Sequence, residues 1–180
     1  MTLTERNRLM TTLWRVMALA ALLPLALTGS RETWAADKGE VLENRLKAAK
    51  LEYRKVKDGV FRVLVEVKGE ITAVIVEEKK APWKDATEKD ALYAFLWTEV
   101  MQFPADFKPP PAMLSRLAEL NDRCRFGSIG LSKTPEGNPA VYRNMSFFLK
   151  GSDAEQLTDY VFMMHNEKLS VKKELKGFQE

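Results

Sequence analysis

The chain has 180 residues, a length that accommodates one domain and a leader. Its 28 basic and 25 acidic residues give a net charge of only +3, so it lacks the basic excess of a nucleic-acid-binding protein. A single cysteine excludes an internal disulfide, and with a single histidine it also excludes a zinc site built from histidines and thiolates.

Residues 1–35 are typical of a secretory leader. Basic residues precede the apolar run Val16–Leu27: Arg6, Arg8 and Arg15. Small residues follow at Thr33 and Ala35, which predicts cleavage before Ala36 and export to the periplasm or the exterior of a bacterial envelope. The alternative is a retained anchor, although a membrane span needs about 20 apolar residues. After cleavage no stable membrane span is expected.

Cleavage also removes the apparent basicity. The leader holds four basic and two acidic residues, so residues 36–180 carry 24 positive and 23 negative side chains. We therefore expect no nucleic-acid partner for the single mature domain, 36–180.

The first predicted element of this domain is a helix over Lys38–Leu51. Asp37 and Glu40 have the spacing of an N-cap and its reciprocal partner. Apolar residues recur on one face of this helix at Leu42, Leu46 and Ala49.

A β-hairpin is predicted next. Asp58-Gly59 is a turn signal, and alternation over Phe61–Val67 indicates a strand. Lys68-Gly69 turns the chain into a second strand over Ile71–Glu77. The register stays open, because Val74 and Val76 compete with Ile71 and Ile75 for the buried face.

The polar stretch Glu78–Asp90, which contains Pro82, is interpreted as a long loop or a short irregular helix. The next segment, Leu92–Gln102, is rich in aromatic residues and is followed by Pro104, and both features favour a third strand there. A buried helix capped by Thr87 and Asp90 is the alternative for that segment.

The second half begins with a helix over Ala112–Arg125, with Pro111 in the first helical position. A strand over Phe126–Leu131 follows, and its Gly127 and Gly130 suggest that the helix packs tightly against it. A turn at Thr134–Pro139 leads to a strand over Ala140–Lys150.

A long final helix is predicted from Asp153 to about Glu174. Ser152 and Glu155 have the spacing of a capping box. The predicted buried stripe consists of Leu157, Tyr160, Val161 and Met164. The predicted fold is a single α+β domain of order α-β-β-β-α-β-β-α, with a five-stranded antiparallel sheet and helices on one face.

This element order resembles that of the YbjN-type domain, which is related to the type III secretion chaperones. The local resemblance lies in Leu117–Asn121, in Arg125-Phe126-Gly127, in the answering strand Tyr142–Leu149 and in the capped final helix. It implies an α+β sandwich without a known catalytic centre that binds other proteins, often as a dimer. The secretory leader departs from the cytosolic chaperones, which argues against carrying over a role with secretion effectors.

No motif demands catalysis. Cys124 and His165 could form a nucleophilic pair, but a buried structural thiol is the commoner role for such a cysteine. Gly127–Gly130 is one residue short of a nucleophile elbow, and no phosphate-binding glycine motif is present. We therefore predict a non-enzyme without catalytic, cofactor-binding or metal-binding residues.

The aromatic residues favour a binding role. Strands such as Phe61–Val67 and Leu92–Gln102 have apolar residues on both sides, so a protein partner or a second subunit is expected to cover the face without helices. The candidate partner-binding residues are Trp83, Tyr93, Phe95 and Trp97. The predicted function is an exported, chaperone-like or regulatory protein-binding module. The alternative is an envelope carrier of a small apolar ligand, in a pocket lined by methionines and aromatics.

Overall fold

A computed structural model describes residues 39–84 and 90–179. All of them belong to the compact unit Ala36–Glu180. The predicted leader and the predicted cap Asp37 lie outside the described residues, as do residues 85–89 of the predicted loop.

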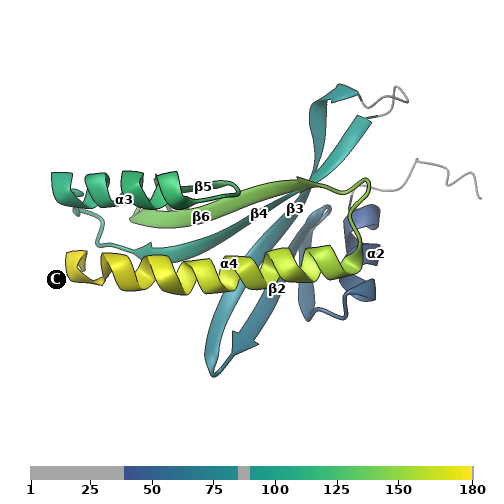
Figure 1. Ribbon diagram of the computed structural model, residues 1–180, viewed down its shortest axis with the longest axis horizontal. Coiled ribbons are helices and arrows are strands. Elements are labelled where there is room, and N and C mark those ends of the chain that lie inside the picture. The colour runs from purple at the N-terminus through teal and green to yellow at the C-terminus, as the bar shows by residue number, and fades with distance from the viewer. Residues whose placement is uncertain (1–38, 85–89, 180) are drawn as a thin grey trace, which may run out of the picture. The chain divides into compact units, whose positions relative to one another are not determined.

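The described residues form an α+β domain with one antiparallel sheet of six strands in the order β1-β2-β3-β4-β6-β5 (Figure 1). The strands are β1 (Tyr53–Lys57), β2 (Val60–Val67), β3 (Glu70–Lys84), β4 (Asp90–Gln102), β5 (Ser128–Lys133) and β6 (Pro139–Phe148). The helices are α2 (Glu40–Ala48), α3 (Pro111–Arg123) and α4 (Ala154–Leu175), followed by the short 3₁₀ helix η1 (Lys176–Phe178). The α+β class is confirmed, and the prediction of five strands is wrong by one.

The strand that the sequence did not reveal is β1. It lies at the edge of the sheet, and its residues after Tyr53 are all exposed. Tyr53 supplies its main packing contact, edge-on to Phe61 with ring centroids 5.7 Å apart. Edge strands commonly carry charged side chains, which here conceal the apolar alternation that identifies a strand.

The predicted β2–β3 hairpin is confirmed, and the structure settles its register. Lys68 and Gly69 have φ angles of 53° and 82°, as a tight two-residue hairpin turn requires. Val63 pairs with Val74, which turns Val74 towards the helices and leaves Ile71 62% exposed. The hairpin projects beyond α4 in Figure 1.

The polar stretch that follows is a strand and not a loop. β3 continues to Lys84, and β4 already begins at Asp90. Pro82 lies in an irregular segment of the ladder, between Lys80 and Lys84, where proline is tolerated. The loop prediction is therefore wrong for 78–84 and for Asp90, whereas the strand prediction for Leu92–Gln102 is confirmed over its helical alternative.

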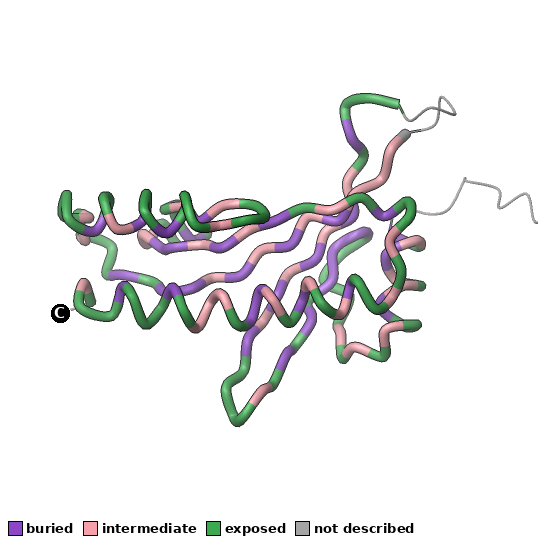
Figure 2. The backbone as a smooth tube through the Cα atoms, in the orientation of Figure 1, coloured by how far each residue is buried: buried purple, intermediate pink, exposed green. Residues whose placement is uncertain are grey.

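All three helices pack on one face of the sheet, over two apolar cores that share α4. The first core joins α2, strands β2–β4 and the N-terminal half of α4, through residues such as Leu42, Phe61, Leu96 and Leu157. The second joins α3, β5, β6 and the C-terminal end of α4, through residues such as Met113, Ile129, Val141 and Leu175. Buried residues alternate with less buried ones along β4 and β6, as a sheet covered on one face requires (Figure 2).

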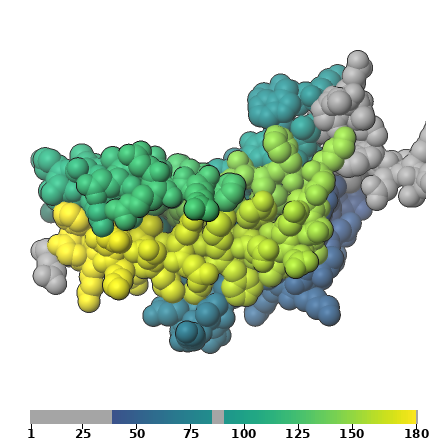
Figure 3. Space-filling view, viewed as in Figure 1, coloured from purple at the N-terminus to yellow at the C-terminus, as the bar shows by residue number. Residues whose placement is uncertain are grey.

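Helices α3 and α4 lie side by side on this covered face (Figure 3). α3 begins at Pro111, as predicted, and buries Met113, Leu117 and Leu120. Arg116 of α3 forms an ion pair with Glu174 of α4. The helix thus carries one apolar side towards the sheet and one charged link to its neighbour.

The start and the buried stripe of α4 differ in detail from prediction. Its capping box is formed by Asp153 and Gln156 and not by Ser152 and Glu155. The Ser152 hydroxyl instead donates a hydrogen bond to the carbonyl of Leu149 at 3.0 Å. Of the predicted stripe, Tyr160 is only half-buried, while the unpredicted His165 is fully buried.

Candidate functional site

The sheet surface opposite the helices, called the open face below, collects aromatic side chains. Buried Ala94, Leu96 and Thr98 of β4 point towards the helices. Strand alternation therefore places Tyr93, Phe95 and Trp97 together on the open face. All three are partly exposed, so they are available at the surface.

Tyr93, Phe95 and Trp97 form an aromatic row along β4, and further aromatic side chains on β3 and β6 extend it. Phe148 of β6 pairs directly with Tyr93, and the ring of Trp83 lies 6.4 Å from that of Phe148. Trp83 and Phe148 are 56% and 53% exposed. Tyr142 packs edge-on against Trp97 with ring centroids 5.8 Å apart. Trp83 therefore belongs to the end of β3 and not to a polar loop.

The four sequence-predicted residues thus lie on one surface, together with two that the sequence analysis missed. Tyr142 and Phe148 share the parity of Asn144 and Ser146 in β6, whereas Val141, Arg143 and Met145 are buried. The alternation in this strand is a signal that could have identified them.

An ion pair lies beside the aromatic row on the open face. Lys79 Nζ lies 3.1 Å from Glu77 Oε2 and 4.7 Å from the centroid of the Phe95 ring, a cation–π distance. Burial raises the pKa of Tyr142, and the nearby charges of Glu99 and Glu136 raise this pKa further. Its hydroxyl therefore stays neutral near pH 7 and can donate a hydrogen bond.

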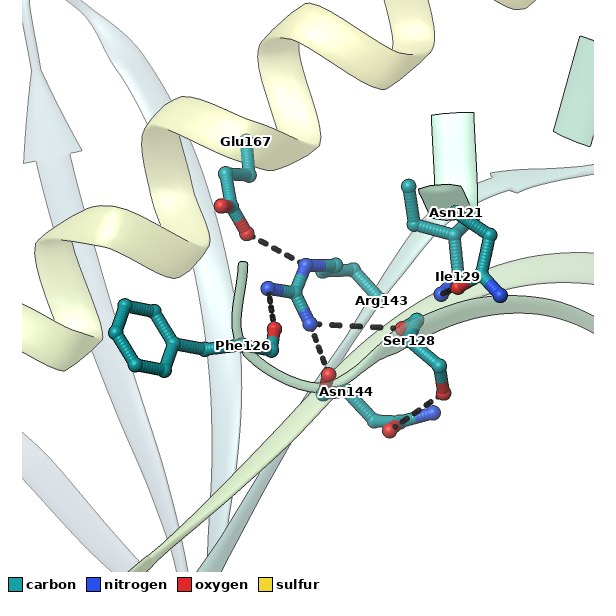
Figure 4. A network of polar contacts seen from close by, with 7 residues as sticks. All are labelled: Asn121, Phe126, Ser128, Ile129, Arg143, Asn144 and Glu167. Atoms are coloured by element: carbon teal, nitrogen blue, oxygen red, sulfur yellow. Dashed lines mark hydrogen bonds and ion pairs between the residues drawn. The ribbon is translucent and has the colours of Figure 1, made fainter. Parts of the chain in front are cut away.

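A buried arginine supports the sheet from the covered side. Arg143 of β6 is fully buried, and its Nε donates to Glu167 Oε2 of α4 at 2.5 Å. The rest of its guanidinium donates to the carbonyl oxygens of Phe126, Ser128 and Asn144 (Figure 4). A buried charge requires such partners, because an unpaired one would be strongly destabilising.

The Phe126-Gly127 pair forms the loop that wraps this arginine. Gly127 has φ +77°, and a Cβ there would lie 2.0 Å from the Asn144 carbonyl oxygen. The Phe-Gly part of the sequence resemblance is therefore a packing requirement. The expected tight packing of the helix does not occur at Gly130, where a Cβ would meet nothing within 4 Å. The close approach at Gly127 comes from β6.

Cys124 and His165 have separate environments. His165 Nδ1 is hydrogen bonded with Thr72 Oγ1 at 2.8 Å, which ties α4 to β3. Cys124 lies at the end of α3, where burial raises the pKa of its thiol and the charge of Arg143 partly opposes the increase. A thiol with a raised pKa is a poor nucleophile at neutral pH. The arrangement therefore favours the structural role for Cys124.

Within the described ranges 39–84 and 90–179, no cluster of three or more histidine, cysteine or acidic residues could hold a metal ion. No helix in the same part of the chain has both the length and the hydrophobicity required to cross a membrane.

Comparison with known proteins identifies a relative in fold. No protein-family model matches the sequence, and no curated protein matches it either. Among solved structures, the chain is similar to YbjN from E. coli, a proposed transcription regulator, with a TM-score of 0.50 and 12% sequence identity. The alignment covers 78% of this chain and 92% of YbjN. At this identity the likeness shows the fold, and the YbjN-like fold expected from the sequence is confirmed.

Proposed function

We propose that this chain is a non-catalytic protein-binding module that captures its partner on the open face. The observation that carries this proposal is the aromatic row, in which Trp83, Tyr93, Phe95, Trp97 and Phe148 share one partly exposed surface. Tryptophan and tyrosine are enriched at the centres of protein interfaces.

The composition of the open face supports a role beyond packing. On β2 its residues are Arg62, Leu64 and Glu66, a mixture suited to a solvated sheet surface. On β4 three successive open-face positions are aromatic, Tyr93, Phe95 and Trp97, although the core on the other face is already filled by Ala94 and Leu96. A contiguous apolar patch of this kind is typical of an interaction site.

The fold is compatible with such a role. We include two further points in the proposal: a relationship to type III secretion chaperones, and the self-association that this relationship implies. In this proposal, residues 1–35 act as a cleaved leader, so that the module lies in the bacterial envelope or outside the cell. The mass of protein recovered from the envelope fraction tests this placement, with a chain beginning at Ala36 expected. A chain that retains Met1 in the membrane fraction would instead support an anchor.

The alternative function, a carrier of a small apolar ligand, receives less support from the structure. Two of the methionines that could line such a pocket, Met145 and Met164, are packed in the first core at 1% and 0% exposure. Native mass spectrometry of the purified protein distinguishes the two functions, because a carrier would retain a ligand of defined mass.

Substitution of Trp83 tests the docking surface. Trp83→Ala is expected to weaken partner binding or self-association by about 2 kcal/mol, the magnitude of an interface hot spot. Thermal stability should change little, because the side chain is 56% exposed. Phe162→Ala on the outer side of α4, where the side chain is 38% exposed, is the matched control. Equal losses in the two variants would show that the open face is not the docking surface.

A further inference from the structure

The open face ends in a pair of arginines that face each other across two strands. Arg54 of the edge strand β1 is the register partner of Arg62 in β2, and both side chains are exposed. Like charges directly opposite each other destabilise a sheet. Among the described residues, neither arginine has an acidic partner within ion-pair distance.

Three carboxylates lie near this pair. Glu52 is opposite Leu64 and on the same side of its strand as Arg54, but it forms no ion pair with either arginine. Glu77 lies diagonally across from Arg62 but holds Lys79 at 3.1 Å. Asp58, at the turn after β1, is 2.9 Å from Lys55. The two arginines therefore lie next to each other at this end of the open face without an ion-pair partner among the described residues.

The arginine pair is aligned with the aromatic row. Arg62 pairs with Ile75, Ile75 pairs with Trp97, and Trp97 pairs with Asn144. One row of side chains thus crosses the open face. It begins with the two arginines, continues with Ile75 and Trp97, and ends with the neutral amide of Asn144. Leu64, the next open-face residue of β2 beside this row, is 38% exposed.

We propose that the partner of the open face is an acidic peptide segment of another protein. It would lie across the strands, with a carboxylate between Arg54 and Arg62 and apolar side chains against Ile75 and Trp97. This inference rests on the proposed function. Guanidinium groups bind carboxylates through two parallel hydrogen bonds, and the bound carboxylate would remove the repulsion between the arginines.

The charge pattern favours an acidic peptide over single-stranded nucleic acid. Nucleic acid requires a continuous positive track for its phosphates together with exposed stacking rings. Here Glu66, Glu77 and Glu99 share the open face with the two arginines. A peptide can match this mixed surface because its charges are confined to chosen positions.

Binding to three synthetic peptide sets tests the proposal. The sets share their apolar positions, and the remaining positions are Asp/Glu, Asn/Gln or Lys/Arg. The acidic set is expected to bind about ten-fold more tightly than the amide set, as the charge-assisted contacts imply. This preference should shrink as salt is added, because the arginines are exposed.

Substitution of the two arginines tests whether they cause the preference for acidic peptides. Arg54→Gln combined with Arg62→Gln should abolish the preference for acidic peptides and retain binding of the amide set. Arg123→Gln, which removes an exposed arginine on the helix side, is the matched control and should preserve the preference. Circular dichroism and thermal unfolding verify that each variant is folded.

The outcomes separate the two proposals. If all three sets bind equally and Trp83→Ala weakens each of them, the docking surface is correct and the acidic partner is wrong. If no set binds, both proposals are overturned. Tighter binding of a single-stranded oligothymidylate than of the acidic set also overturns the acidic partner, as does a concentration-dependent dimer that excludes the peptides.

Discussion

Single residues fix this fold through contacts that are distant in sequence. Glu78 of β3 is 5% exposed, and its carboxylate accepts hydrogen bonds from the backbone N–H groups of Gly39 at 2.8 Å and Leu42 at 3.0 Å. It therefore caps α2, whose N-cap residue makes no side-chain cap bond of its own. The sequence offered Asp37 for this role, but the cap seen in the structure comes from a strand.

Glu78→Gln should test this cap. We expect a loss of about 2 kcal/mol in the free energy of unfolding, because two buried hydrogen bonds to a carboxylate are weakened. Glu77→Gln, one residue earlier and on the open face, should cost less than about 0.5 kcal/mol, as a surface ion pair does. Urea denaturation measures both variants, and similar losses would contradict the capping role.

Two glycines provide a second matched pair. Gly127→Ala should destabilise the domain by about 3 kcal/mol, because it combines a positive φ with a Cβ clash against the Asn144 carbonyl. Gly130→Ala should be neutral or stabilise by up to about 1 kcal/mol, since that position is roomy. Thermal unfolding of the two variants makes the comparison, and a stable Gly127→Ala protein would refute the wrapped-arginine geometry.

At the scale of elements, the start of α4 depends on one residue. The Asp153 Oδ1 accepts a hydrogen bond from the Gln156 N–H at 2.8 Å, and the Gln156 side chain accepts one from the Asp153 N–H at 3.1 Å. Asp153→Ala should cost about 1 kcal/mol of stability. Glu155→Ala should cost less than about 0.5 kcal/mol, the size of an exposed helix-dipole effect. Hydrogen exchange at the Gln156 amide reports the loss locally, and an equal effect of Glu155→Ala would support the sequence-based cap instead.

The link between α3 and α4 is expected to respond to acid. The hydrogen bond from Arg116 lowers the pKa of Glu174 below its ordinary value of 4.5. A lowered pKa in the folded state means that the link contributes stability above the unfolded-state pKa and loses it as pH falls through the folded-state pKa. The protection of α3 amides against hydrogen exchange, measured relative to the intrinsic exchange rate at each pH, should therefore fall below about pH 4.

Arg116→Gln is the control for this acid response. It should remove the difference between neutral and acidic pH in α3, although acid still affects the rest of the domain. The effect should also weaken with added salt, because the pair is partly exposed. A pH response in α3 that persists unchanged in Arg116→Gln would assign it to another group.

At the scale of the whole molecule, α4 makes the two cores one cooperative unit. Leu157 of α4 lies in the first core and Leu175 in the second, each fully buried. Leu157→Ala and Leu175→Ala should each cost about 3 kcal/mol and lower the midpoint of a single transition. Tryptophan fluorescence and circular dichroism follow the unfolding, and two separate transitions would contradict the coupling through α4.

The sequence by itself determined those elements whose signal is local. The β2–β3 turn follows from Lys68-Gly69, α3 from Pro111 and its apolar repeat, and β4 from its aromatic content, because each depends on backbone preferences or on alternation within one segment. The same local reasoning selected Trp83, Tyr93, Phe95 and Trp97 as partner-binding candidates.

Only the tertiary structure decided the features that join distant segments. The edge strand β1 shows no alternation of its own and exists through its pairing with β2. Glu78 belonged to the predicted loop until the fold brought it to the start of α2. The burial of Arg143 likewise depends on Glu167 of α4, which is distant in sequence. The pairing of Arg54 with Arg62 is equally non-local. A contact between residues far apart in sequence has no periodicity, so it becomes visible only when the chain is folded.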